Sequence, residues 1–318
     1  ERSIELDDRF PTVWRNLGLA YYNKRSDKAR ALAAMERAFA LDPADGRVLM
    51  ELDQLYRKIG RAPSDRLSKL EQHLRLVEHR DDLYLERITL HTLLGHYRTA
   101  YDLLAQRRFH PWEGGEGKVT GQYVTCCVGL AKEALVDRRY QEAIEFLQAA
   151  GEYPENLGEG KLPGALENDR HYYLGCAYQG MGIPEKAEEQ LRRATVGLKE
   201  PAPAYFYNDQ RPDTIYYQGL ALRKLGNEEE ASGRFATLVR FAEQHMNDAV
   251  TMDYFAVSFP DLLIWDEDLS ERNRINCTYL KALGLLGLGK AGEASSLFHA
   301  VLDADPAHAG AATHLMSL

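Results

Sequence analysis

The sequence has few cysteines and no long apolar run. Its four cysteines are Cys126, Cys127, Cys176 and Cys277. They lack C-x-x-C spacing and fall in segments that we expect to be helical, so we interpret them as small buried side chains. This usage favours a reducing compartment, and we expect the cytoplasm. No apolar run reaches the roughly 18 residues that a membrane span needs, so we expect no membrane partner.

Positive charge and catalytic motifs are also scarce. The formal net charge is -9 over 318 residues, which argues against nucleic acid as a partner. There is no G-x-S-x-G elbow and no H-E-x-x-H pair, and the five-residue step from His91 to His96 does not place both on one helical face. We expect no metal and no cofactor, and catalytic residues stay unknown. The chain opens ERSIELDD without an initiator Met, from which we expect a piece of a larger protein.

No stretch alternates with a period of two, so we expect essentially no sheet. A helical pattern is present instead. Near the start, Trp14, Leu17, Gly18 and Tyr21 form W-x-x-L-G-x-x-Y, followed by a stretch ending ERAFALDP. This pattern resembles the tetratricopeptide repeat, a helix-turn-helix unit of about 34 residues. Small residues in the pattern let the two helices of a unit approach closely.

The pattern recurs along the whole chain. Further copies are LYRKIG near Gly60, LGHYRTAYDLL near Gly95, RRYQEAIEFLQAA near Ala143, HYYLGCAYQGMGIPEKAEEQLRRA near Gly175, IYYQGLALRKLGNEEEASGRFATL near Gly219, and TYLKALGLLGLGKAGEASSLFHAVLDADP near Ala282. We predict an all-α, right-handed superhelix of about seven hairpins, one solenoid over residues 1–318. Gly60, Gly95, Gly182, Gly226 and Gly289 are expected to end first helices. HAGAATHLMSL predicts one more helix, a cap or the start of another repeat.

The spacing of the copies is uneven. It is 34 to 35 residues at first, 43 or 44 from the third to the sixth copy, and about 63 before the last. The extra residues fall between one unit and the next, at about 109–121, 152–168, 199–212 and 245–274. Insertions at one repeated junction stack along one edge of a solenoid, often the binding face. We therefore expect these four inserts to line one edge.

Two inserts share an octapeptide, PWEGGEGK and PENLGEGK, and both read P-x-x-x-G-E-G-K. A phosphate-binding loop needs G-x-x-x-x-G-K-[ST] after a strand. Here Trp112 takes the place of the first glycine, Val119 or Leu162 follows the lysine, and the context is helical. We interpret the octapeptides as tight structural connections, and a ligand role for Glu116 and Glu159 stays open.

A second candidate site comes from aligning the first helices of the last three units. Tyr172, Tyr216 and Tyr279 take one groove-facing position, and one turn earlier stand Asp169, Asp213 and Asn276. This D/N-x-x-Y ladder suits a sugar, a peptide or the surface of another domain. The alternative is that the Asp and Asn side chains cap helices while the tyrosines pack. The groove lacks the Lys and Asn pattern of tetratricopeptide domains that bind chaperone tails.

The inserts also carry aromatic residues, namely Trp112, Tyr205, Phe206, Tyr207, Tyr254, Phe255, Phe259 and Trp265. Aromatic side chains on loops near carboxylates, such as Asp209, are typical of partner or carbohydrate sites. FAVSFPDLLIWDEDL is too apolar for a free loop and is expected to pack on the solenoid or dock another domain. The acids Glu113, Glu116, Glu159, Asp209, Asp261 and Asp266 cannot be paired for glycosidic chemistry by spacing alone.

The inserts resemble a further group of proteins. R-x-F-H-P-W-E-G-G-E-G-K, Y-P-E-N-L-G-E-G-K-L and D-Y-F-A-V-S-F-P-D-L-L are similar to the C-terminal helical region of large bacterial multidomain proteins with a carbohydrate-enzyme-like N-terminal part. The resemblance covers roughly residues 105–300 and implies a helical scaffold. We expect the chain to dock a partner protein or that N-terminal domain. The alternative is a helical carbohydrate-binding or glycoside-processing module.

Overall fold

The computed structural model describes residues 1–201, 210–250 and 264–318, and within these ranges it contains helices and no strand. The helices are α1 (Arg2–Leu6), α2 (Pro11–Arg25), α3 (Lys28–Leu41), α4 (Gly46–Lys58), α5 (Pro63–Glu71), α6 (Leu74–Glu78), α7 (Asp81–Leu93), α8 (Tyr97–Gln106), α9 (Lys118–Val136), α10 (Tyr140–Ala149), α11 (Asn168–Gly180), α12 (Pro184–Arg193), α13 (Thr214–Lys224), α14 (Glu228–His245), α15 (Leu269–Gly287), α16 (Ala291–Ala304) and α17 (Ala309–Leu315), with a short 3₁₀ helix at Glu155–Leu157.

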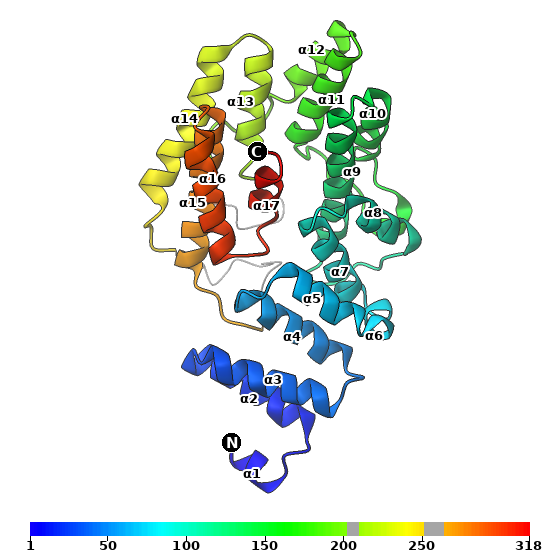
Figure 1. Ribbon diagram of the computed structural model, residues 1–318, viewed down its shortest axis with the longest axis vertical. Helices are drawn as coiled ribbons and strands as arrows, with labels where there is room; N and C mark the ends of the chain where they lie inside the picture. Colours follow the sequence, from blue (N-terminus) through cyan, green and yellow to red (C-terminus); the bar gives the residue numbers. More distant parts are fainter. Residues whose placement is uncertain (202–209, 251–263) are drawn as a thin grey trace.

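Within the described ranges, these helices form seven successive hairpins. The pairs are α2 with α3, α4 with α5, α7 with α8, α9 with α10, α11 with α12, α13 with α14, and α15 with α16. The hairpins stack into the predicted right-handed superhelix, which bends until its last hairpins lie opposite the middle ones (Figure 1). The all-α solenoid expected from the repeats is confirmed.

Each first helix ends at a residue in the left-handed backbone region. The seven positions and their φ values are Ser26 (52°), Gly60 (81°), Gly95 (77°), Arg138 (60°), Gly182 (73°), Gly226 (85°) and Gly289 (80°). The next N–H then reaches back over the helix end. Ile183 N donates to Tyr178 O at 3.0 Å, for example. This is a Schellman end. The five glycines end first helices as expected. Ser26 and Arg138 adopt the same left-handed conformation although they are not glycines.

Close packing within the hairpins explains their small residues. A Cβ added at Gly219 would lie 2.4 Å from the Phe235 ring, and one at Gly175 would lie 2.6 Å from Leu191 Cγ. Both glycines therefore allow a large side chain of the second helix to fill the contact, as the repeat pattern predicts.

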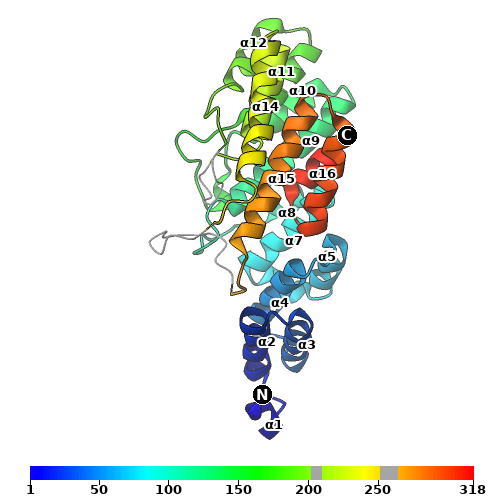
Figure 2. The ribbon, with the colours of Figure 1, turned by 90° about the vertical axis from the view of Figure 1, so that its left-hand side faces the viewer.

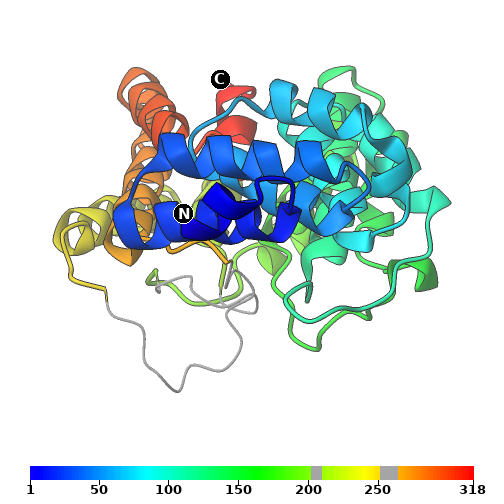
Figure 3. The same ribbon diagram turned by 90° about the horizontal axis from the view of Figure 1, so that it is seen from below.

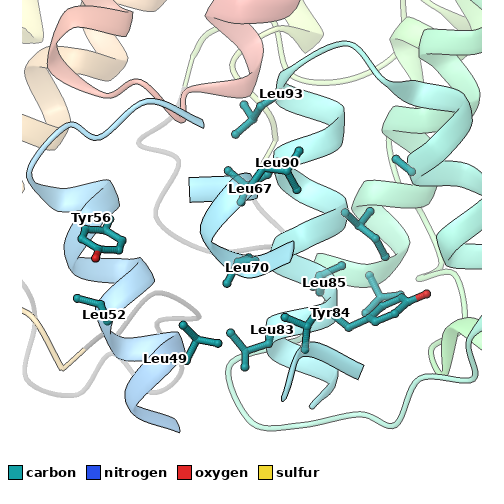
Figure 4. Packing of buried hydrophobic residues seen from close by; sticks show 14 of the residues in the cluster. Leu49, Leu52, Tyr56, Leu67, Leu70, Leu83, Tyr84, Leu85, Leu90 and Leu93 are labelled. Atoms are coloured by element: carbon teal, nitrogen blue, oxygen red, sulfur yellow. The ribbon is translucent and has the colours of Figure 1, made fainter. Parts of the chain in front are cut away.

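The largest described core runs through the first half of the chain. Figure 4 shows side chains from α4, α5 and α7 meeting in it, including Leu52, Leu70 and Leu90. These leucines have no exposed surface. Helices α4 and α5 each bury one apolar face, and α7 is buried around most of its circumference. This burial removes apolar surface from water and holds neighbouring hairpins together.

The chain also returns to its own beginning. The segment before α15 reaches α4 (Figure 1). There Asn23 of α2 donates through Nδ2 to Ile264 O at 2.7 Å and accepts from Asp266 N at 3.0 Å. Lys58 of α4 pairs with Glu267 at 2.9 Å. The last insert therefore joins the first two hairpins to the seventh.

The described parts of the four inserts gather on one side of the molecule, and the C-terminus lies on the opposite side (Figures 2 and 3). In the structure the inserts span 107–117, 150–167, 194–213 and 246–268. The first and last are shorter than expected at their C-terminal ends, because α9 and α15 begin earlier. Asp268 starts α15 by accepting from Ser270 N at 2.9 Å and Glu271 N at 3.1 Å.

Candidate functional site

Two rungs of the D/N-x-x-Y ladder meet at one arginine. Asp169 lies in the first turn of α11 and Asp213 immediately precedes α13. Arg211 Nη2 lies 2.8 Å from Asp169 Oδ2, and its Nε lies 3.7 Å from Asp213 Oδ1. Asp213 holds the N-cap position without a side-chain capping bond. The two acids therefore hold a guanidinium that the sequence pattern did not point to.

The third rung has a different setting. Asn276 lies inside α15, which starts at Leu269, so it is not at a helix start. Its side chain is half-buried. Asp268, not Asn276, is the residue that caps this helix. The capping alternative for Asn276 is therefore wrong, and only Asp169 and Asp213 share one polar cluster.

The ladder tyrosines pack mainly against other aromatic rings. Tyr216 and Tyr279 are buried, with 8% and 3% of their surface exposed, and Tyr172 is half-buried. The Tyr172 ring lies 5.8 Å from Tyr217, and Tyr216 lies 5.5 Å from it. Tyr217 Oη also lies 3.4 Å from Tyr173 Oη. These neighbours, Tyr173 and Tyr217, follow the ladder positions directly in sequence.

Helix α17 covers two of these tyrosines. His314 of α17 lies 5.3 Å from the Tyr216 ring and stacks on Phe298 at 5.6 Å. His308, just before α17, lies 4.6 Å from the Tyr279 ring. The groove-facing positions expected for a ligand are thus occupied by the end of the described chain. Both histidines lie in the segment HAGAATHLMSL, which predicted a helix, but no pattern in the sequence indicated that they pack on these tyrosines.

Two carboxylates flank the single guanidinium of Arg211. Burial would raise the pKa of Asp169, but Arg211 and backbone hydrogen bonds hold it below its usual range. Burial raises the pKa of Asp213 despite the nearby Arg211. The two carboxylates in turn raise the pKa of Arg211. The Arg211 side chain still keeps 49% of its surface exposed. It is the part of this cluster that a ligand can reach.

Lys132 of α9 reaches the same region. Its Nζ donates to Ser317 Oγ at 2.7 Å, beyond the end of α17. Burial lowers the pKa of Lys132, and the charge of Asp169 opposes that shift. Burial, followed by the charges of Lys132 and His308, lowers the pKa of His314 to about 3. His314 is therefore neutral at physiological pH.

The two octapeptides bind each other. The Glu159 carboxylate accepts from Gly117 N at 3.0 and 3.2 Å, at the start of α9. Phe109 N donates to Asn156 O at 2.7 Å. Gly158 has φ +80°, and a Cβ there would lie 2.7 Å from Phe109 O. The repeat of the octapeptide is thus a contact between neighbouring inserts, which is the structural interpretation for Glu159.

The other insert residues fall into three groups. Trp112 is half-buried and lies on Gly115, where a Cβ would come within 2.3 Å of its ring, and Glu116 nearby is half-buried. Trp265 is 2% exposed, and its Nε1 donates to Glu51 O at 3.1 Å. Trp265 is therefore part of the core, as expected if its segment packs on the solenoid. Outside the described residues lie Tyr205, Phe206, Tyr207, Asp209, Tyr254, Phe255, Phe259 and Asp261.

The second and third inserts present apolar side chains to solvent. Leu162, Val196 and Leu198 are 51%, 59% and 59% exposed, and we call these three the insert edge. The backbone of Val196 and Leu198 is fixed by amide side chains. Asn168 Nδ2 donates to Val196 O at 2.7 Å, and Gln218 Nε2 donates to Val196 O and Leu198 O at 3.1 Å each.

Among the residues that the structure describes, no group of three or more His, Cys, Asp or Glu side chains is arranged to hold a metal ion. The turn at Gly95 does bring His91 Nδ1 within 3.4 Å of His96 Nδ1. In the same described ranges, no helix is long and apolar enough to cross a membrane.

No known protein family matches the sequence. The structure is similar to a tetratricopeptide repeat protein from Parabacteroides merdae, with 11% identity, coverage of 96% of this chain and 97% of that one, and a TM-score of 0.47. It is also similar to a MamA mutant, with 19% identity, coverage of 58% and 95%, and a TM-score of 0.39. Because both scores are below 0.5, the fold assignment rests on the seven hairpins themselves.

Proposed function

We propose that this chain is an interaction scaffold. It holds a partner protein, or a neighbouring domain of the same chain, against the insert edge and the inner surface of the solenoid. The observation that carries the proposal is the insert edge, where Leu162, Val196 and Leu198 are more than half exposed, and where Asn168 and Gln218 fix the backbone of Val196 and Leu198 by hydrogen bonds. Apolar side chains held rigidly in water favour docking, because the scaffold loses little conformational entropy when a partner covers them.

The partner class follows from the chemistry of this surface. The backbone N–H of Leu198 donates to Gln210 Oε1 at 2.8 Å, and the next residue, Arg211, is half-exposed and lies near two carboxylates. A protein segment with apolar anchors and a polar rim suits this combination. The four cysteines are free thiols, which favours a reducing compartment such as the cytoplasm.

Site-specific photo-cross-linking in the source cells tests the proposal. A benzophenone amino acid replaces Leu162 or Leu198 on the insert edge. The matched control replaces Gln141, which is exposed on α10, the second helix of its pair. We expect the same cross-linked protein from both insert-edge positions and none from position 141. Cross-links that are equally strong at position 141, or absent at positions 162 and 198, would contradict the proposal.

A carbohydrate-binding or glycoside-processing module is the second candidate. The observation that favours it is the pair Asp169 and Asp213, whose pKa values are shifted in opposite directions beside one arginine. Such a split is typical of acid and base pairs. Thermal shift against an oligosaccharide panel, with wild type and Asp213→Asn, separates the candidates. A shift with one sugar class that Asp213→Asn abolishes would favour the carbohydrate module over the scaffold.

A further inference from the structure

Helix α17 bridges the inside of the superhelix. It lies between the α13–α16 hairpins and the α7–α9 region (Figure 1), and the C-terminus is on the side away from the inserts (Figure 2). On one side it meets hairpins six and seven. His314 is enclosed by the rings of Tyr216, Tyr217 and Phe298, at 5.3, 6.3 and 5.6 Å. At Gly310, a Cβ would lie 2.4 Å from Tyr279 Oη.

On its other side α17 reaches hairpins three and four. Lys132 Nζ of α9 donates to Ser317 Oγ at 2.7 Å. A Cβ at Gly95, in the turn between α7 and α8, would lie 3.3 Å from Met316 Sδ. α17 packs directly on α7 as well as on α16. A single short helix thus spans units that are far apart along the chain.

The attachment of α17 is slight for such a central position. The helix has seven residues, AGAATHL, of which only Ala311 and His314 are buried. Met316 and Leu318 just after it are each 54% exposed. Helices this short are not stable alone, so α17 depends on its docking contacts. Most side chains of α17 are small, so docking buries little apolar area and contributes little stabilising free energy.

We propose that α17 is a displaceable internal ligand of the inner surface, and that it competes there with a helix of a partner protein. The competing helix has the same chemistry, a run of small residues that can approach Tyr279 closely, followed by a neutral side chain of histidine size among Tyr216, Tyr217 and Phe298. This inference rests on the proposed scaffold function and adds its regulation. The inner surface becomes available when α17 leaves.

The competition can be measured without knowing the partner. The probe is a fluorescein-labelled peptide of residues 305–318, DPAHAGAATHLMSL, added to the full chain. In the chain variant Gly310→Val, the added side chain meets Tyr279 and weakens the internal α17. We expect the variant to bind the peptide at least about tenfold more tightly than wild type, because the internal competitor is weaker. The matched control is Gly292→Val in α16, where a Cβ meets nothing within 4 Å, and it should bind like wild type.

Two further measurements keep the test decisive. Ala311→Glu places a charge at a fully buried position of α17 and should release the helix independently of Gly310. Hydrogen exchange should become faster at 309–315 in both variants while α15 and α16 stay protected. Equal peptide affinity in wild type and in both variants would overturn the proposal. The two proposals can fail separately. If cross-linking at the insert edge fails while the variants bind the peptide more tightly, only the proposed scaffold function is contradicted.

Discussion

The indole Nε1 of Trp265 donates a hydrogen bond to the carbonyl oxygen of Glu51, 3.1 Å away and 214 positions earlier in the chain. The ring also packs edge-on against Tyr22 at 5.2 Å. Arg57 Nη2 lies 3.4 Å from Asp305 Oδ2 close by. The superhelix is therefore held at a fixed curvature by contacts between its first and last hairpins, in addition to contacts between neighbours.

Trp265→Ala tests this long-range attachment. Removing a buried Trp costs about 3–5 kcal/mol because it leaves a cavity as well as losing apolar burial. We expect a lower free energy of unfolding in urea and a larger radius of gyration in small-angle X-ray scattering. Trp112→Ala, at a half-buried insert position, is the control and should leave the radius unchanged. An unchanged radius for Trp265→Ala would show that stacking alone sets the curvature.

Gly158→Val tests the contact between the two octapeptides. The position has φ +80°, and the new Cβ would also collide with Phe109 O. We expect a loss of about 2–4 kcal/mol, from left-handed backbone strain together with the collision. Gly160→Val, two residues on with nothing within 4 Å of its Cβ, is the matched control and should change the melting temperature little. Equal losses at both positions would count against the contact.

The pH dependence of stability should report on His314. Its pKa is lowered from 6.5 to about 3 in the folded chain, chiefly by burial. Between these values the unfolded chain binds more protons. The free energy of unfolding should therefore fall as the pH drops below about 6.5, by up to about 1.4 kcal/mol per pH unit.

The variant His314→Phe keeps a ring at this position and removes the titration. Urea unfolding at several pH values between about 4 and 7 should then show a shallower slope. Burial also lowers the pKa of His171 and His308, so part of the slope should remain. His299→Phe, at an exposed position on α16, is the control. A slope identical to wild type in His314→Phe would show that another group controls the acid response.

Arg138→Gly should stabilise the fold. Arg138 ends α9 with φ 60°, which strains a residue that has a Cβ. We expect a gain of about 0.5–1 kcal/mol, reduced by the greater freedom of glycine in the unfolded chain. The reverse change, Gly182→Ala at φ 73°, should cost about 1 kcal/mol although nothing lies within 4 Å of its Cβ. Differential scanning calorimetry should show melting temperatures that move in opposite directions; shifts of the same sign would contradict the strain argument.

The sequence by itself determined the hairpins, because they depend on contacts between residues close in the chain. Gly219 against Phe235, and the left-handed turn at Gly182, follow from local patterns that recur in each unit. The inserts were also readable as interruptions of that spacing. Their ends were less certain, because the start of α15 depends on the single capping residue Asp268.

Only the tertiary structure decided which distant residues meet. Trp265 at Glu51 and His314 against Tyr216 are positioned by the curvature of the superhelix. Arg211 reaches Asp169 of the neighbouring unit from the insert before α13. That curvature is the sum of small rotations from one hairpin to the next, modified by inserts of different length. No local pattern encodes such a sum. The repeats could therefore be predicted, whereas the closure of the superhelix and the occupation of its inner surface by α17 could not.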